Sequence, residues 1–264
     1  MADGRAPHAD AMCRVRALFI SDVHFGTRDC QAGRLLELLQ STRAERIYLI
    51  GDIVDGWRLK ASWYWPPSHD AAVRTVLRLM QEGTRVLYIP GNHDEFLRTS
   101  LGLSLGGIEI VDHAIHRGAD GRSHLVIHGD VFDPVVARMR RLAALGIWVY
   151  AAAVLGNDAV NRWRRRFRQR AAAPNRVHAF ERLAVAEARR RRLDGVICGH
   201  VHCPALHAVD GIQYLNTGDW VESCTAAVEH LDGSFAMIGS AMPVADRRRR
   251  TARVGEVALA ARSS

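Results

Sequence analysis

Five short groups of polar residues along the chain have the composition of metal ligands. They are Asp22-Val23-His24, Gly51-Asp52-Ile53-Val54-Asp55, Gly91-Asn92-His93-Asp94, His128-Gly129-Asp130 and Gly199-His200-Val201-His202. Each group offers carboxylate, imidazole or amide atoms, and none contains a cysteine. Mixed ligation of this kind suits Mn²⁺ or Fe²⁺ and tolerates Zn²⁺ or Co²⁺. The sequence therefore predicts a metal centre that favours Mn²⁺.

Two divalent cations at one site would give these ligands a hydrolytic function. Such cations repel each other, so an anion has to lie between them, and the carboxylate of Asp52 is the natural bridge. A pair about 3.5–4 Å apart lowers the pKa of a bridging water and holds both oxygens of an in-line displacement. The predicted chemistry is hydrolysis of a phosphoester or a phosphoanhydride.

Each group also has a structural explanation when it is taken alone. An isolated Asp-x-His pair is usually structural, and Gly-Asn-His-Asp suits a turn, because Asn and Asp favour turns. His200 and His202 alternate along the chain and could form a surface pair. The occurrence of five such groups, each at the predicted end of a strand, argues for the metal centre.

Strands of an α/β sheet are expected to position these groups. Runs rich in β-branched residues at Val15–Ile20, Arg46–Ile50 and Arg85–Ile89 alternate with leucines at helical spacing over Cys30–Gln40 and His69–Gln81. In a sheet of this kind, ligands gather at the carboxyl ends of the strands. The glycines beside the motifs let the backbone turn sharply toward a common point.

The second half of the chain continues the sheet pattern around a helical interruption. Further strands are expected at Ile108–Val111, Ala114–His116, His124–Ile127, Gly195–Cys198, Ala205–Val209, Ile212–Leu215, Ala226–His230 and Ser234–Ile238. Residues 134–193 form an Arg-rich helical block, interpreted as a cap inserted within one domain of residues 14–240. Residues 1–13 and 244–264 are expected to be disordered.

The order of the motifs resembles a known family. D-x-H, G-D-x-x-D, G-N-H-D, H-G-D and G-H-x-H follow one another as in the calcineurin-like metallophosphoesterases, over roughly residues 14–240. The resemblance implies an α/β fold with the layers of an αββα four-layer sandwich. It implies a first metal position formed by Asp22, His24, Asp52 and His202. It implies a second metal position formed by Asp52, Asn92, His128 and His200.

The same resemblance implies roles for residues beside the ligands. In the superfamily the position of His93 contacts the phosphate and stabilises charge or protonates the leaving oxygen. Asp94 would orient this imidazole. Asp55 and Asp130 either support ligands in a similar way or cap turns.

Within the superfamily the chain is most similar to the UDP-2,3-diacylglucosamine hydrolases of lipid A synthesis. The likeness lies in Ser21–Gly26, Gly51–Arg58, the helical insertion and Asn216–Glu222. It implies cleavage of the pyrophosphate to UMP and diacylglucosamine 1-phosphate. The best-known branch of that family has the pattern G-N-R-D at the third motif, whereas this chain has His93 in place of the arginine. A sister branch with a soluble nucleotide-type substrate therefore stays open, as does a non-catalytic scaffold on the same fold.

Substrate contacts are expected from a loop and from the cap. The residues are Trp57, Arg58, Arg164, Arg165 and Arg166. The two loop residues could stack on a base or sugar or pack against the cap, whereas the cap arginines could meet pyrophosphate or anionic headgroups. Leu142–Leu155 could line an acyl groove, lie at a bilayer interface, or pack on the sandwich.

The composition is consistent with a single globular domain that has an anionic partner. The chain has 264 residues, 48% of them hydrophobic, and a formal net charge of +8. Residues 138–192 contain 15 arginines and three acidic residues. These arginines cluster beside an apolar helix rather than interleaving with exposed aromatic residues along a strand or groove, which favours an anionic membrane surface over nucleic acid. Five cysteines without a CxxC pair and a leader without an apolar core predict a cytoplasmic protein, peripheral at the inner membrane.

Overall fold

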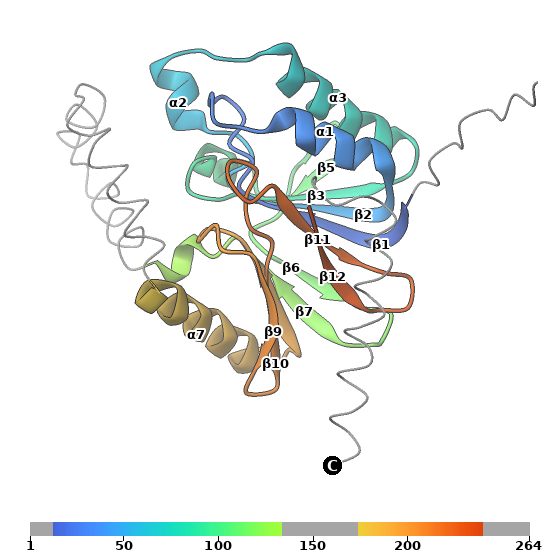
Figure 1. Cartoon of the computed structure of the whole chain (residues 1–264), viewed down its shortest axis with the longest axis vertical. Coiled ribbons are helices and arrows are strands. Elements are labelled where there is room, and N and C mark those ends of the chain that lie inside the picture. Colours follow the sequence, from blue (N-terminus) through green and yellow to red (C-terminus); the bar gives the residue numbers. More distant parts are fainter. Residues whose placement is uncertain (1–12, 134–173, 240–264) are drawn as a thin grey trace, which may run out of the picture.

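The computed structural model describes residues 13–133 and 174–239, which form two β-sheets packed face to face (Figure 1). The first sheet has seven strands in the order β12-β11-β1-β2-β3-β5-β4. They are β1 (Cys13–Ile20), β2 (Thr42–Ile50), β3 (Arg85–Ile89), β4 (Ser104–Leu105), β5 (Ile108–Ile110), β11 (Thr225–Glu229) and β12 (Phe235–Gly239). Strands β1, β2, β3 and β5 are parallel, so their carboxyl ends meet at one edge.

The second sheet has five strands in the order β6-β7-β8-β10-β9. They are β6 (Ala114–Arg117), β7 (Ser123–Val126), β8 (Gly195–Cys198), β9 (Ala205–Val209) and β10 (Ile212–Asn216). Its central strands β7, β8 and β10 are parallel. Alternate residues of the two sheets face each other and form a buried apolar layer that includes Phe19, Ile50, Val126, Ile197 and Leu215.

Helices cover the outer face of each sheet and complete the four layers (Figure 1). Helices α1 (Ala32–Ser41) and α3 (Pro67–Gln81) lie on the first sheet, and the leucines of α1 at helical spacing are buried against it. Short elements follow the motifs: α2 (Gly56–Ala61), η1 (Glu95–Ser100) and η2 (Asp130–Phe132). The predicted αββα sandwich is confirmed.

Helix α7 (Pro174–Arg190) corrects the predicted extent of the cap. The sequence pattern places residues 174–190 within the inserted block, but α7 is the outer layer of the second sheet. Phe180, Ala184 and Ala188 recur at four-residue spacing and are buried beside β8. The remainder of the expected cap lies outside the described residues, and it includes Leu142–Leu155, Arg164, Arg165 and Arg166.

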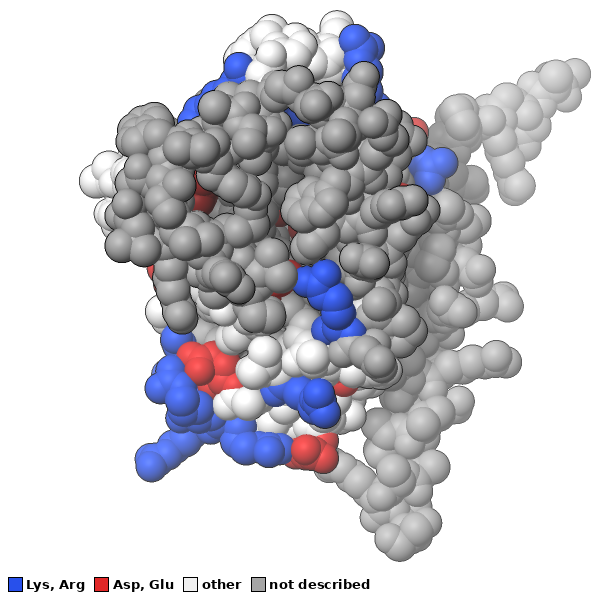
Figure 2. Space-filling view, turned by 90° about the vertical axis from the view of Figure 1, so that its left-hand side faces the viewer, with Lys and Arg blue, Asp and Glu red and all other residues white. Residues whose placement is uncertain are grey.

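Basic and acidic side chains lie side by side on the face of the molecule near α7 (Figure 2). At the end of this helix, Glu187 accepts hydrogen bonds from Arg190 and Arg191, both at 2.7 Å. Arg189 lies 3.6 Å from Asp210. These acidic residues neutralise part of the positive charge of the Arg-rich region. Among the described residues, no helix combines the length and apolar character needed to cross a bilayer.

Candidate metal centre

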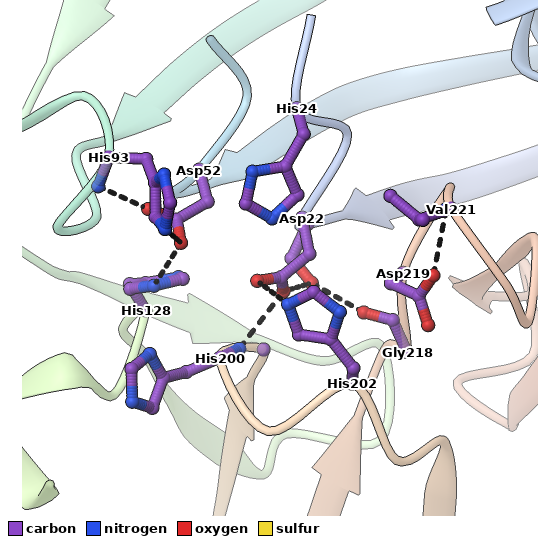
Figure 3. A network of polar contacts seen from close by, with 12 residues as sticks. Asp22, His24, Asp52, His93, His128, His200, His202, Gly218, Asp219 and Val221 are labelled. Carbon is purple, nitrogen blue, oxygen red and sulfur yellow. Dashed lines mark hydrogen bonds and ion pairs between the residues drawn. The ribbon is translucent and has the colours of Figure 1, made fainter. Parts of the chain in front are cut away.

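The polar motifs converge where the parallel strands of both sheets end (Figure 3). From the first sheet, Asp22 and His24 follow β1, Asp52 follows β2 and Asn92 follows β3. From the second sheet, the contributors are His128 after β7 and the pair His200 and His202 after β8. The sandwich therefore brings together residues that are up to 180 positions apart in the sequence.

Three overlapping groups of side chains place potential ligand atoms within 4.8 Å of one another. Their members are Asp22, His24 and His202; His24, Asp52 and His93; and Asp52, His128 and His200. The first and last of these groups match the two predicted metal positions, and Asp52 connects them because it shares a group with His24 and another with His128. The Asp and His clusters are thus consistent with a dinuclear metal site.

Four buried atoms of the predicted ligands make no hydrogen bond within the part of the chain that the structure describes. They are Asp22 Oδ1, His24 Nε2, Asn92 Oδ1 and His128 Nε2. A buried polar atom without a partner costs about 1–3 kcal/mol. Asp22 Oδ1 and His128 Nε2 each lie within ion-pair distance of another predicted ligand, His202 at 3.2 Å and Asp52 at 3.5 Å. Coordination of divalent cations would satisfy all four atoms. The donor set therefore fits a metal pair.

The carboxylate of Asp22 is held so that one oxygen stays available. Its Oδ2 accepts hydrogen bonds from the hydroxyl of Ser21 at 2.5 Å and from the backbone N–H of His200 at 2.9 Å. Ser21 is fixed in turn by Thr217, whose hydroxyl lies 2.6 Å away. The free oxygen, Oδ1, points into the centre and lies 3.2 Å from His202 Nε2.

Two of the histidines are oriented through the ring nitrogen that faces away from the centre. His128 Nδ1 donates to the backbone carbonyl of Ile50 at 3.0 Å. His24 Nδ1 lies 3.7 Å from Asp55 Oδ2. A partner on one nitrogen fixes the ring and its tautomer and leaves the other nitrogen for a metal. In both rings this arrangement presents Nε2.

Most of the predicted ligands occupy unusual backbone conformations. Positive φ angles of 51–69° occur at Asp22, His24, Asp52, His200 and His202. Residues with side chains rarely adopt this region, and its cost is accepted mainly at functional sites. The left-handed conformation turns each side chain sharply out of the strand that precedes it, toward the common point.

Opposite charges account for the electrostatics of the centre. Burial raises the pKa of Asp22, but His202 and His128 outweigh this effect and bring it to about 2. Burial also raises the pKa of Asp52, whereas His128 and His93 hold it well below its usual range. For His128, burial lowers the pKa, but Asp52 and Asp22 raise it to about 10. The carboxylates are therefore ionised and stabilise positive charge, as a cation site requires.

Asp55, and not Asp94, orients His93, which corrects the prediction. Asp55 Oδ2 lies 3.1 Å from His93 Nδ1, while its Oδ1 accepts the backbone N–H of Arg58 and caps α2. Asp55 thus has both of the roles that the sequence left open. Burial lowers the pKa of His93, whereas Asp52 and Asp55 raise it to about 9.

Asp94 joins the backbone of neighbouring loops instead. Its carboxylate is fully buried and accepts hydrogen bonds from the N–H groups of Gly91 at 2.6 Å and Ile53 at 2.9 Å. It also accepts one from the hydroxyl of Tyr88 at 2.5 Å. These contacts of Asp94 hold the second and third motifs together, and none of its hydrogen bonds is to the His93 side chain.

Residues at the rim match the remaining predictions only in part. The Trp57 ring lies 4.5 Å from that of His93 and is 39% exposed, so it borders the centre. Arg58 is exposed on α2. Asp130 is held by Arg98, which also donates to the carbonyl of Pro90. Sequence reasoning missed Arg98, because no local motif signals a contact that forms only when two distant loops meet.

Glycines next to the ligands leave no room for a side chain, which gives a first prediction. A Cβ at Gly91 would lie 2.3 Å from Asp52 Oδ1 and 2.8 Å from His128 Cδ2. Gly91→Ala should therefore displace both ligands and weaken metal binding by about 10–100-fold, the range for changes next to ligands. Calorimetric titration with Mn²⁺ measures this loss.

Gly33→Ala is the matched control, because a Cβ there meets no atom within 4 Å. It lies within α1, where alanine is preferred over glycine, so the control should bind metal normally and unfold at the same or a higher temperature. Equal metal affinities in the two variants would contradict the packing argument.

The chain is similar to known proteins in sequence and in structure. The family model for calcineurin-like phosphoesterases matches residues 15–204. The UDP-2,3-diacylglucosamine hydrolase of Pseudomonas paraeruginosa is 28% identical over 225 residues, covering 77% of this chain and 90% of that protein. The protein of the same name from Neisseria gonorrhoeae is 23% identical and covers 83% and 95%. A solved structure described as a novel archaeal phosphodiesterase has a TM-score of 0.41 at 14% identity and covers 84% and 98%.

Proposed function

Because the chain belongs to the calcineurin-like phosphoesterase family, we propose that it hydrolyses the pyrophosphate of UDP-2,3-diacylglucosamine with two divalent metals. The products would be UMP and diacylglucosamine 1-phosphate. The observation that carries the hydrolytic function is the set of overlapping Asp/His groups, in which Asp52 shares one group with His24 and another with His128. The choice of substrate is supported by the relatives named UDP-2,3-diacylglucosamine hydrolase, at 23–28% identity.

The proposed ligands divide into the two positions that the family pattern implies. The first position has Asp22, His24, Asp52 and His202, and the second has Asp52, Asn92, His128 and His200. Asp52 Oδ1 accepts the backbone N–H of His93 at 2.8 Å, so Oδ2 is the oxygen left to face both positions. When bound, the metals would supply an activated water and neutralise charge on the phosphate, with Mn²⁺ favoured and Fe²⁺, Zn²⁺ or Co²⁺ as alternatives.

His93 is proposed to donate a proton to the oxygen of the leaving group. Asp55 holds its Nδ1, and its Nε2 lies 3.9 Å from Asp52 Oδ2, on the side of the ligands. The imidazole is partly exposed, whereas Asp52 is buried, so a substrate that reaches the centre would contact His93. Asp94 would assist indirectly by holding the loop that carries His93.

Contacts beyond the phosphate are proposed on the side of α2 and in the Arg-rich segment. Trp57 borders His93, and Arg58 follows it on the same short helix. Arg164, Arg165 and Arg166 would bind anionic groups of the substrate or of an anionic membrane surface. Such a substrate would place the protein at the cytoplasmic face of the inner membrane.

Turnover of a set of substrates with Mn²⁺ tests the proposal. UDP-2,3-diacylglucosamine should give the highest kcat/KM, with UMP as a product. UDP-N-acetylglucosamine lacks the two long acyl chains and should be a poor substrate. The set should include cyclic nucleotides, dinucleotides and p-nitrophenyl phosphate. His128→Ala serves as a blank for contaminating phosphatases.

A soluble nucleotide-type phosphodiester is the second candidate. It is favoured by His93, because the best-known branch of the lipid hydrolases has an arginine at this position of the third motif. A higher kcat/KM for a soluble nucleotide than for the lipid would select this candidate and reject the first.

A further inference from the structure

One predicted ligand, His200, is held from its outer side by a residue outside all five motifs. Its Nε2 lies 3.4 Å from Asp133 Oδ2, within hydrogen-bond distance. An imidazole that donates Nε2–H to a carboxylate has Nδ1 as its remaining metal-binding nitrogen. The other members of the group that contains His200 are Asp52 and His128. The contact with Asp133 therefore determines which nitrogen faces the second metal position.

Asp133 is itself fixed by helix α7. Arg176, in the first turn of α7, lies 3.3 Å from the same Oδ2 that faces His200. The backbone N–H of Asp133 donates to the carbonyl of Asp130 at 3.2 Å, which closes η2. The Asp133 carboxylate thus lies between a guanidinium and an imidazole.

The same helix also packs against the ring of His200. Phe180 lies one turn beyond Arg176, and its ring stacks on His200 at 5.9 Å with an interplanar angle of 29°. Phe132 supports Phe180 from the edge at 5.9 Å. Gly129 allows this approach, because a Cβ there would lie 2.6 Å from the Phe180 ring. The imidazole is therefore oriented through its face as well as through Nε2.

We propose that Asp133 is the positioning residue of His200, and that α7, through Arg176 and Phe180, sets the affinity of the second metal position. The inference rests on the proposed dinuclear centre. A carboxylate on the outer nitrogen of a metal-binding imidazole fixes its orientation and raises its basicity. His24 and His128 also have a partner outside the centre, but on Nδ1: Asp55 at 3.7 Å and the Ile50 carbonyl at 3.0 Å.

Mn²⁺ titration of the metal-free full-length protein tests this inference without any substrate. Asp133→Ala should weaken one of the two Mn²⁺ sites by about 10–100-fold and leave the other unchanged. Asp133→Asn, which keeps an acceptor but loses the charge, should have a smaller effect, as should Arg176→Gln. Asp70→Ala is the matched control, because Asp70 pairs with Arg74 on the exposed face of α3. Calorimetry gives the affinities, and the electron paramagnetic resonance spectrum of coupled Mn²⁺ reports the filling of both sites.

The outcomes are distinguishable. Selective weakening of one site, with a melting temperature of the metal-free protein equal to that of Asp70→Ala, supports the proposal. Unchanged affinities at both sites would overturn it. A parallel loss of both affinities and of melting temperature would also overturn it, because a purely structural role acts in that way. A wild-type protein that binds fewer than two Mn²⁺ would instead overturn the proposed dinuclear centre.

Discussion

Asp52→Ala should bind neither metal and lose hydrolytic activity by roughly 10⁶-fold, the lower end of the range for enzymatic rate enhancement. Asp52 belongs to the ligand group of His24 and to that of His128, and its Oδ1 also accepts the backbone N–H of His93. Without its charge, no carboxylate would remain between the two positions, and the adjacent cations would repel each other. Elemental analysis of the dialysed variant gives the metal content directly.

Two further variants make this experiment specific. Asp52→Asn keeps the shape and one oxygen, so it separates the contribution of charge from that of packing. Asp70→Ala removes an exposed carboxylate and should retain both metals and full activity. Two metals per chain in Asp52→Ala would show that the assignment of this residue as the bridge is wrong.

His93→Ala should retain both metals and lower kcat by about 10²–10⁴-fold for a phosphodiester with an alkoxide leaving group, the usual contribution of general acid catalysis. The variant keeps the backbone N–H that bonds to Asp52, so the ligands should stay in place. The loss should depend on the leaving group. The loss of kcat should be small for a p-nitrophenyl ester, because p-nitrophenolate leaves without a proton. It should reach its full size for an ester with an alkoxide leaving group.

Measuring kcat across phosphodiesters with leaving groups of increasing pKa therefore tests the role of His93. The slope of log kcat against that pKa should be steeper for His93→Ala than for the wild type. Asp55→Asn should change the slope in the same direction, because Asp55 holds His93 Nδ1. Parallel slopes for all three proteins would show that His93 acts only by binding the phosphate.

The strands of the fold could be predicted because the local patterns agree with the tertiary structure, whereas the four layers were implied by the family resemblance. Strand β3 matches its predicted bounds, Arg85–Ile89, and β8 matches Gly195–Cys198. Buried parallel strands appear in the sequence as short apolar runs, and glycines follow their ends. The metal motifs were visible for a related reason, since each is a contiguous segment that follows one strand.

The errors concern features that depend on distant contacts. The apolar face of α7 resembles that of any amphipathic helix, so nothing local tells whether it covers a sheet or belongs to a cap. Asp94 adjoins His93 in sequence but is turned toward Gly91, Ile53 and Tyr88, whereas Asp55 reaches His93 from another loop. Adjacency along the chain does not determine which side chains meet.

The span between the first and last motifs has a consequence for how the protein acquires its metals. Asp22 Oδ2 is hydrogen-bonded to the N–H of His200, 178 residues further along the chain. Contacts of such high sequence separation are expected to form slowly, because the loop-closure entropy is lost before the contact stabilises the chain. With the proposed ligands, a chain still emerging from the ribosome would lack His200 and His202 and could complete neither position. Metal would then be selected by a nearly folded protein, in which the strand ends fix the spacing that a cation must match.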